Sequence, residues 1–191
     1  MSVRDLVAQF KMNNLKRKME PSFFEFPKAI RSPKHILVCL PGELRELTLV
    51  KQFLPGITDL FKPASITLLT MPGLKITDIF PHKGFNILAP TVDQLTWSGM
   101  AKKSYLEFLQ KEGFDLLLDL NLSSSMFTSS ILLSFPNAIR VGRGNHLGQP
   151  FYNLEIKTRY LRDELNIYRS LIDTLKILKE GNKQSADSHQ K

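Results

Sequence analysis

The sequence predicts an α/β protein built on a single open, doubly wound and mostly parallel sheet. From His35 onward, short apolar runs of strand length alternate with helical stretches, which is typical of parallel strands joined by right-handed crossovers. Runs such as His35–Leu40 are apolar almost without interruption, as expected for strands that are covered on both faces. The 191 residues, 42% of them hydrophobic, are enough for one core but hardly for two.

An amphipathic helix is predicted over residues 2–19, before the sheet begins. Ser2 is a suitable N-cap, and the apolar side chains that follow at the spacing of one helical face are Val3, Leu6, Val7 and Phe10. The opposite face and the C-terminal end carry the cations Lys11, Lys16, Arg17 and Lys18. Two alternatives are open: the helix docks on the domain with a solvated charged face, or it lies in a membrane interface.

Charge concentrates in residues 1–34, which we interpret as a basic extension. They hold eight Lys and Arg residues against three acidic ones, whereas the rest of the chain is near neutral, with 18 basic and 15 acidic residues. Such a local excess attracts anionic lipid, nucleic acid or an acidic protein. Nucleic acid is the least favoured, because aromatic residues do not alternate with the cations outside the cluster Phe23–Phe26.

The predicted domain, residues 35–180, holds six strands and the helices between them. We expect strands at His35–Leu40, Ser65–Thr70, Phe85–Ala89, Phe114–Leu120, Ala138–Val141 and Phe151–Ile156. We expect helical stretches at Leu44–Lys62 with an interruption at Pro55-Gly56, at Gly99–Lys111 and at Ser124–Ser134, and a short turn near Ile76–Ile79. A long C-terminal helix over Leu161–Lys179 should end before Gly181, a natural C′ residue. Residues 181–191 are polar and are predicted to be a flexible tail.

Candidate ligand-binding residues follow the strands, because ligands of open α/β sheets bind beyond the carboxyl ends of the strands. After the first strand, Gly42 permits a tight turn, and Glu43 falls in the first turn of the next helix. There Glu43 can act as a general base or complement the helix dipole. After the fourth strand, Asp119 and Asn121 can contact a ligand or satisfy backbone donors of neighbouring loops.

The segment Arg140–His146 combines two glycines with two arginines at the end of a predicted strand. It is predicted to be a loop in which side chains such as Arg143 and Asn145 hold a phosphate or sugar hydroxyls. A solvated loop without a ligand explains the same composition.

Missing motifs exclude several kinds of chemistry. The phosphate-binding, dinucleotide-binding, serine-hydrolase, zinc-protease and C-x-x-C signatures do not occur, so no cofactor is expected. The four histidines show no ligand spacing, so no metal site is expected either. A single cysteine, Cys39, and the lack of a signal pattern or a membrane-spanning run favour the cytoplasm, including the inner face of a membrane.

Four segments, taken in order, carry a resemblance to a known family. They are the first strand with Gly42-Glu43, Ile66–Gly73, Phe114–Asn121 with Ser129–Leu133, and Ala138–Gly142. They are similar to a strand with a Gly-Asp loop, a Thr-x-Pro-like turn, an "FDLVIDL" strand with its helix, and an "a-x-R-I-G-F" strand of the heptosyltransferases. These glycosyltransferases build the lipopolysaccharide core, and the resemblance is to their N-terminal half over roughly residues 35–180.

In that family two Rossmann-like domains face each other. The N-terminal domain binds the acceptor and supplies an Asp base, and the C-terminal domain binds the ADP-sugar donor. The resemblance therefore implies a Rossmann-like fold with Glu43 at the position of the base. It further implies an acceptor cleft lined by Gly42, Asp119, Asn121, Arg143 and Asn145.

Two departures from the family shape the functional hypothesis. No donor-binding domain follows residue 180 in this sequence, and Glu43 is one methylene longer than the family's Asp. We therefore expect a glycosyltransferase-like half-domain that is not catalytic alone and acts as an interaction or accessory subunit at a membrane surface. Its contacts to a protein or to anionic lipid would come from the N-terminal helix. The alternative is the acceptor-binding lobe of a split heptosyltransferase-like enzyme in lipopolysaccharide or glycolipid synthesis, completed by a donor lobe on another chain.

Overall fold

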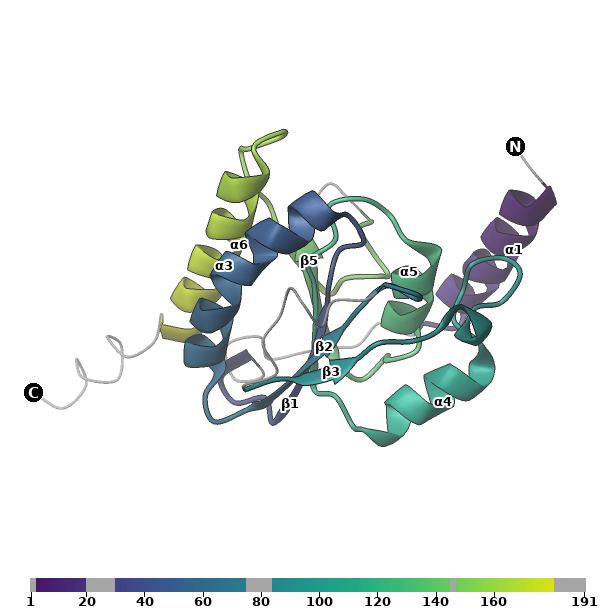
Figure 1. Ribbon diagram of the computed structural model, residues 1–191, viewed down its shortest axis with the longest axis horizontal. Helices are drawn as coiled ribbons and strands as arrows, with labels where there is room; N and C mark the ends of the chain where they lie inside the picture. The colour runs from purple at the N-terminus through teal and green to yellow at the C-terminus, as the bar shows by residue number, and fades with distance from the viewer. Residues whose placement is uncertain (1–2, 20–29, 75–83, 145–146, 181–191) are drawn as a thin grey trace, which may run out of the picture.

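The computed structural model describes residues 3–19, 30–74, 84–144 and 147–180. Within these residues a six-stranded sheet has the order β3-β2-β1-β4-β5-β6, and every neighbouring pair of strands is parallel (Figure 1). The order changes direction between β1 and β4, which is the topological switch point of a Rossmann-like sheet. The predicted doubly wound α/β fold is confirmed, and the six strands are parallel throughout.

The strands and the helices between them occur along the chain in the order that we predicted. The strands are β1 (His35–Cys39), β2 (Ser65–Leu69), β3 (Asn86–Leu88), β4 (Leu116–Asp119), β5 (Ile139–Arg143) and β6 (Leu154–Ile156). The helices are α1 (Val3–Arg17), α3 (Leu44–Phe61), the 3₁₀ turn η1 (Val92–Gln94), α4 (Lys103–Lys111), α5 (Met126–Leu133) and α6 (Glu164–Glu180). The predictions for the Phe23–Phe26 cluster, the turn at Ile76–Ile79, Asn145 and the tail 181–191 fall outside the described residues.

Helices cover both faces of the sheet, and each face has its own core. Alternate residues of β1 point to opposite sides, so that Ile36 and Val38 pack under α3 and α6, while Leu37 and Cys39 face α4 and α5. Figure 1 shows α3 and α6 side by side on one face and α5 on the other. Because both faces are covered, the strands read as continuous apolar runs.

Three helices differ from the prediction. Helix α4 begins at Lys103 rather than at Gly99, whose φ of +79° is not helical. Pro55 does not interrupt α3, because it lies on the exposed side while Leu54 and Ile57 on either side of it are buried in the core. Helix α6 begins at Glu164 rather than at Leu161. Asp163 accepts a hydrogen bond from the backbone N–H of Asn166, as an N-cap does, and Leu161 is left exposed.

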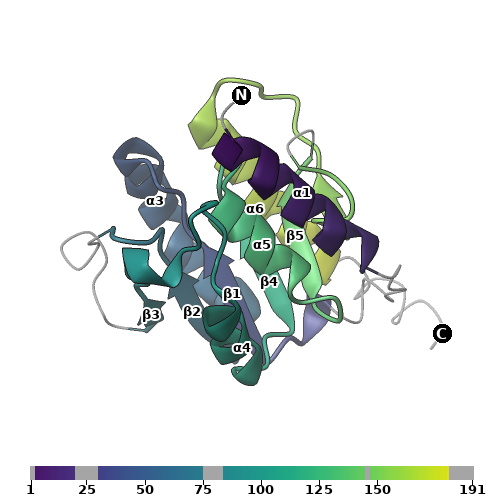
Figure 2. The same cartoon turned by 90° about the vertical axis from the view of Figure 1, so that its right-hand side faces the viewer.

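Helix α1 docks on α5, as one of the two alternatives expected (Figure 2). It does so through a stripe that the sequence pattern did not single out, with Ala8 and Met12 buried. Most of the predicted apolar face points away from the domain: Val3, Leu6 and Phe10 are exposed, whereas Val7 is half-buried. The helix therefore carries two apolar stripes, only one of which has a partner within the described residues.

Candidate functional site

The carboxyl edge of the sheet brings together the loops that follow β1, β2 and β4. The loop after β1 lies against the loop after β2, because a Cβ atom on Gly42 would sit 3.2 Å from Cγ of Met71. Only a residue without a side chain fits there without displacing Met71. The structure thus explains Gly42 by the close approach of two loops, and its contact with a ligand stays a prediction.

Glu43 occupies the N-cap position of α3, one residue before the first turn in which it was predicted. Its backbone carbonyl accepts a hydrogen bond from the N–H of Leu47, at 2.9 Å. Its side chain is exposed and makes no capping hydrogen bond. A general base has to be held in one orientation toward the proton that it removes. Within the described residues nothing fixes the Glu43 carboxylate in this way.

Asp119 lies at the end of β4 and is 1% exposed. Its carboxylate accepts hydrogen bonds from the Tyr152 hydroxyl at 2.7 Å, from Nδ2 of Asn121 at 2.6 Å and from the backbone N–H of Asn121 at 3.0 Å. Burial, and then the charge of Asp119, raise the pKa of the Cys39 thiol and of the Tyr152 hydroxyl. Hydrogen bonds of Asp119 and Asn121 thus connect the end of β4 to Tyr152. The Asp119 carboxylate is satisfied by Tyr152 and Asn121, and the ligand role of Asp119 and Asn121 stays a prediction.

The segment Arg140–His146 was predicted to be a loop, but its first four residues, Arg140–Arg143, belong to a strand. β5 extends from Ile139 to Arg143, because each of its positions through Val141 pairs with β4 and its last three pair with β6. Arg140 is 4% exposed, and its guanidinium donates to backbone carbonyls. Arg143 is half-buried and donates through Nη2 to the carbonyl of Leu161 at 3.3 Å.

A cavity of about 470 Å³ lies at the carboxyl edge, between α1 and the start of α5. Its polar lining comes from Arg4 and Asp5 of α1, Ser98 of the segment before α4, and Ser125. Ser125 caps α5 by accepting a hydrogen bond from the N–H of Thr128, so the helix begins after Ser125 and not at Ser124 as predicted. Sequence reasoning missed Arg4 and Ser98, because only the docking of α1 brings them together.

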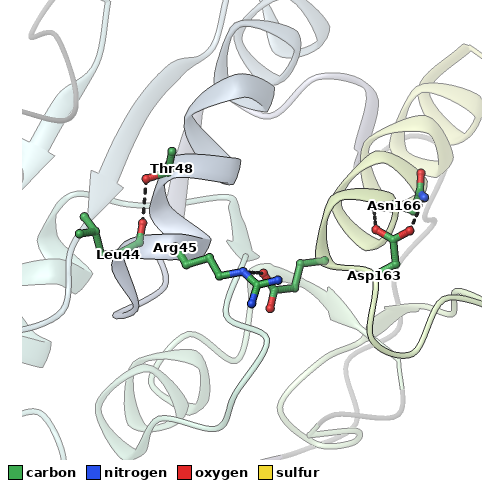
Figure 3. A network of polar contacts seen from close by, with 6 residues as sticks. Leu44, Arg45, Thr48, Asp163 and Asn166 are labelled. Carbon is green, nitrogen blue, oxygen red and sulfur yellow. Dashed lines mark hydrogen bonds and ion pairs between the residues drawn. The ribbon is translucent and has the colours of Figure 1, made fainter.

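A second cavity, of about 680 Å³, separates the start of α3 from the start of α6. Arg45 bridges it through an ion pair of 3.1 Å with Glu164 (Figure 3). The pair joins two helices of the same face, but Arg45 is largely exposed, so it adds little stability. Glu46 lies near this pair and is half-buried.

Glu46 is expected to destabilise the fold at neutral pH. Burial raises the pKa of its carboxyl, opposed in part by a hydrogen bond from the backbone of Leu122, and Glu164 and Glu43 raise it further. With a folded pKa above the unfolded one, stability is highest below the unfolded pKa and falls as pH rises through the folded pKa. We expect Glu46→Gln to raise the urea midpoint at pH 7 and to have little effect near about pH 3.5, where the carboxyl is mostly protonated.

The described part of the chain holds neither a cluster of metal ligands nor a helix that could cross a membrane. No group of three or more His, Cys, Asp and Glu side chains in residues 3–19, 30–74, 84–144 and 147–180 could hold a metal ion. None of the helices in those ranges is both long enough and apolar enough to cross a membrane.

No protein-family model matches the sequence, and no curated protein is significantly similar to it. Solved structures do match. Escherichia coli heptosyltransferase WaaC with ADP has a TM-score of 0.54 at 14% identity, over 73% of this chain and 46% of that one. WaaC with ADP-2-deoxy-2-fluoro heptose gives 0.51 at 12% identity, over 73% and 47%. A family 9 glycosyl transferase from Veillonella parvula gives 0.52 at 16% identity, over 82% and 43%.

These matches are a likeness of fold. They confirm the resemblance to heptosyltransferase-like glycosyltransferases at that level, since identities of 12% to 16% establish no shared activity. The chain spans less than half the length of the structures that it matches.

Proposed function

We propose that this chain is a glycosyltransferase-like half-domain that acts as an interaction or accessory subunit at a membrane surface and is not catalytic alone. One observation carries the proposal: neither candidate carboxylate at the switch point is arranged as a base. Asp119 is buried and bound by three donors, and Glu43 is exposed with no partner in the described residues that orients it. Transfer of a sugar requires the reacting groups in near-attack geometry.

A protein partner is supported by apolar side chains exposed around the carboxyl edge. Leu44 begins α3, Val92 begins η1 and Met126 begins α5, and they are 65%, 67% and 40% exposed. All three follow strands of a parallel sheet, so they surround the edge at which a second lobe would face this one. Exposed apolar side chains gathered at one edge favour a binding surface over a purely solvated one.

A location at a membrane surface is supported by the charge of α1. Lys11, Arg17 and Lys18 are exposed and available to anionic headgroups. Lys16 was predicted to belong with them, but its ammonium lies over the ring of Phe151, 4.7 Å from the centroid, on the docked side.

The alternative, an acceptor-binding lobe of a split transferase, is favoured by the cavity between α1 and α5. Its volume of about 470 Å³ falls in the range of small-molecule sites, and Arg4, Ser98 and Ser125 offer hydrogen-bonding groups for a saccharide. In that case a donor lobe on another chain would complete the site, and Glu43 would act as the base.

The two functions are separated by comparing three forms of the chain: wild type, Glu43→Gln, and a form without residues 2–19. We expect affinity purification from the native cells to recover a stoichiometric protein with wild type and Glu43→Gln. The truncated chain should lose it, because α1 lies beside Met126 at the same edge, where both line the first cavity. Circular dichroism should show that the truncated chain keeps its α/β signature.

Glycosyl transfer from ADP-sugars, measured on the purified assemblies, completes the test. For an accessory subunit, Glu43→Gln should leave the transfer rate within about twofold of wild type. A loss of about a hundredfold or more, of the size that removal of a general base causes, with the fold and assembly intact, would establish the split enzyme instead.

A further inference from the structure

Helix α1 presents an apolar stripe to solvent on the side opposite the one that docks. Each residue advances the helix by about 100°, so Val3, Leu6 and Phe10 lie nearly opposite Ala8 and Met12. The docked residues are 2% and 5% exposed, whereas the outer ones are 71%, 54% and 68% exposed. An outer face that merely solvates a surface helix would be polar.

The docked stripe fixes the direction in which the outer stripe points. Met12 belongs to the core that contains Phe127 and Ile131 of α5, and Leu15 and Met19 pack against the same core. The cation–π contact of Lys16 with Phe151 adds a polar attachment on that side. Because the two stripes are opposite, α1 can stay docked while its outer face binds something else.

The charges beside the outer stripe favour an anionic occupant. Residues 3–19 hold five cations, Arg4, Lys11, Lys16, Arg17 and Lys18, against the single acid Asp5. Lys11, Arg17 and Lys18 are exposed, and their long side chains can reach around an inserted apolar face to headgroups. An apolar face flanked by cations is the arrangement of a helix that lies in a membrane interface.

We propose that the outer face of α1, with Val3, Leu6 and Phe10, inserts into the headgroup region of an anionic bilayer while the helix remains docked on α5. This inference rests on the proposed membrane-surface location and names the contact that makes it. Trp97 lies near α1: it is 65% exposed in the segment whose Ser98 and Gly99 line the cavity beside Arg4. Tryptophan favours the membrane interface, where its ring is partly apolar and its N–H stays hydrated.

The test uses the full-length purified chain and vesicles of phosphatidylcholine with or without about one-third phosphatidylglycerol. We expect co-sedimentation with the anionic vesicles, a loss of binding in about 0.5 M salt, and quenching of tryptophan emission by brominated lipid. The emission reports on one site, because Trp97 is the only tryptophan of the chain.

A matched pair of double variants tests the residues. Leu6→Ser/Phe10→Ser removes two outer apolar side chains of α1. The control, Leu161→Ser/Ile177→Ser, removes two other exposed apolar side chains: Leu161 just before α6, which is 74% exposed, and Ile177 on α6, which is 68% exposed. Figure 1 shows α1 and α6 at opposite ends of the molecule. We expect the α1 variant to bind anionic vesicles at least about tenfold more weakly and the control to bind like wild type.

Three outcomes would overturn the inference. They are no binding of wild type to anionic vesicles, equal losses in both double variants, and a dimer in solution that Leu6→Ser/Phe10→Ser dissociates. Binding without quenching of Trp97 would overturn the inference as well, because the bilayer would then contact a face away from α1 and the neighbouring Trp97. The first two results would not bear on the protein partner, because the affinity purification is carried out in detergent without lipid, so the accessory role can fail or stand separately. The dimer would instead make a second copy of this chain the occupant of the outer face.

Discussion

Replacing Arg140 with methionine is expected to lower the free energy of unfolding by about 3 kcal/mol. The Arg140 guanidinium is buried and donates to the carbonyls of Phe135 at 2.6 Å and Phe151 at 2.9 Å, with longer contacts to Pro136, Ala138 and Pro150. Methionine fills much of the same volume but donates no hydrogen bond. Within the described residues, the carbonyls of Phe135 and Ala138 then keep only the N–H of Ala138 at 3.3 Å and Nδ2 of Asn153 at 3.1 Å. An unsatisfied buried polar group costs about 1–3 kcal/mol, partly offset here by removal of a buried charge.

The charge of Arg140 is held by carbonyl oxygens alone. Within the described residues no carboxylate lies within 4.0 Å of it, and burial lowers the pKa of the guanidinium. Lysine keeps the charge but cannot span carbonyls on two sides, so Arg140→Lys should lose most of the same stability.

Urea unfolding followed by circular dichroism measures these effects. Arg159→Met is the matched control, because Arg159 is exposed and its replacement should leave the urea midpoint close to that of wild type. An unfolding free energy of Arg140→Met within about 1 kcal/mol of wild type would show that the carbonyls find other donors.

The second large effect is expected at Gly142, where alanine should cost about 3 kcal/mol. A Cβ atom there would overlap Cε1 and Cζ of the Tyr152 ring and lie 2.7 Å from its Cδ1. The ring cannot simply move aside, because Tyr152 is 1% exposed and its hydroxyl donates to Asp119. Because the ring is held by burial and by its hydroxyl, the overlap forces a shift of β5 or of the hydrogen bonds among Tyr152, Asp119 and Asn121.

Gly56→Ala is the control for Gly142→Ala. Gly56 lies inside α3, and a Cβ atom there would meet nothing within 4 Å. Alanine at that position should stabilise the protein by about 0.5–1 kcal/mol, because it has the higher helix propensity. If Gly142→Ala left the urea midpoint unchanged, close packing of Tyr152 against β5 would be ruled out.

Arg140 and Gly142 also show where sequence reasoning went astray. Their composition indicated a ligand-binding loop, since a glycine-rich basic segment at a strand end can hold an anion. In the structure the arginine binds backbone carbonyls, and the glycine admits an aromatic ring. The Tyr152 ring and the carbonyl of Phe151 come from a distant segment, and local pattern contains no information about which distant segment packs there. The carbonyl of Phe135 is only five residues from Arg140.

The fold was predictable because its signals are local or periodic. Continuous apolar runs identified the strands, the alternation of strands with helices identified parallel crossovers, and the order of four short segments identified heptosyltransferase-like architecture. The carboxyl edge as the place of the candidate site followed from the parallel sheet alone.

Tertiary structure decided which polar side chains at that edge are exposed and which are buried and hydrogen-bonded to other side chains. Asp119 and Glu43 both follow strands, yet one is buried under three donors and the other is exposed without an orienting partner. Tertiary structure also decided which stripe of α1 faces solvent. The sequence alone determined that this helix carries apolar side chains at helical spacing, but burial depends on the surface that the docked helix meets, and that surface is assembled from α5 and Phe151, more than a hundred residues away.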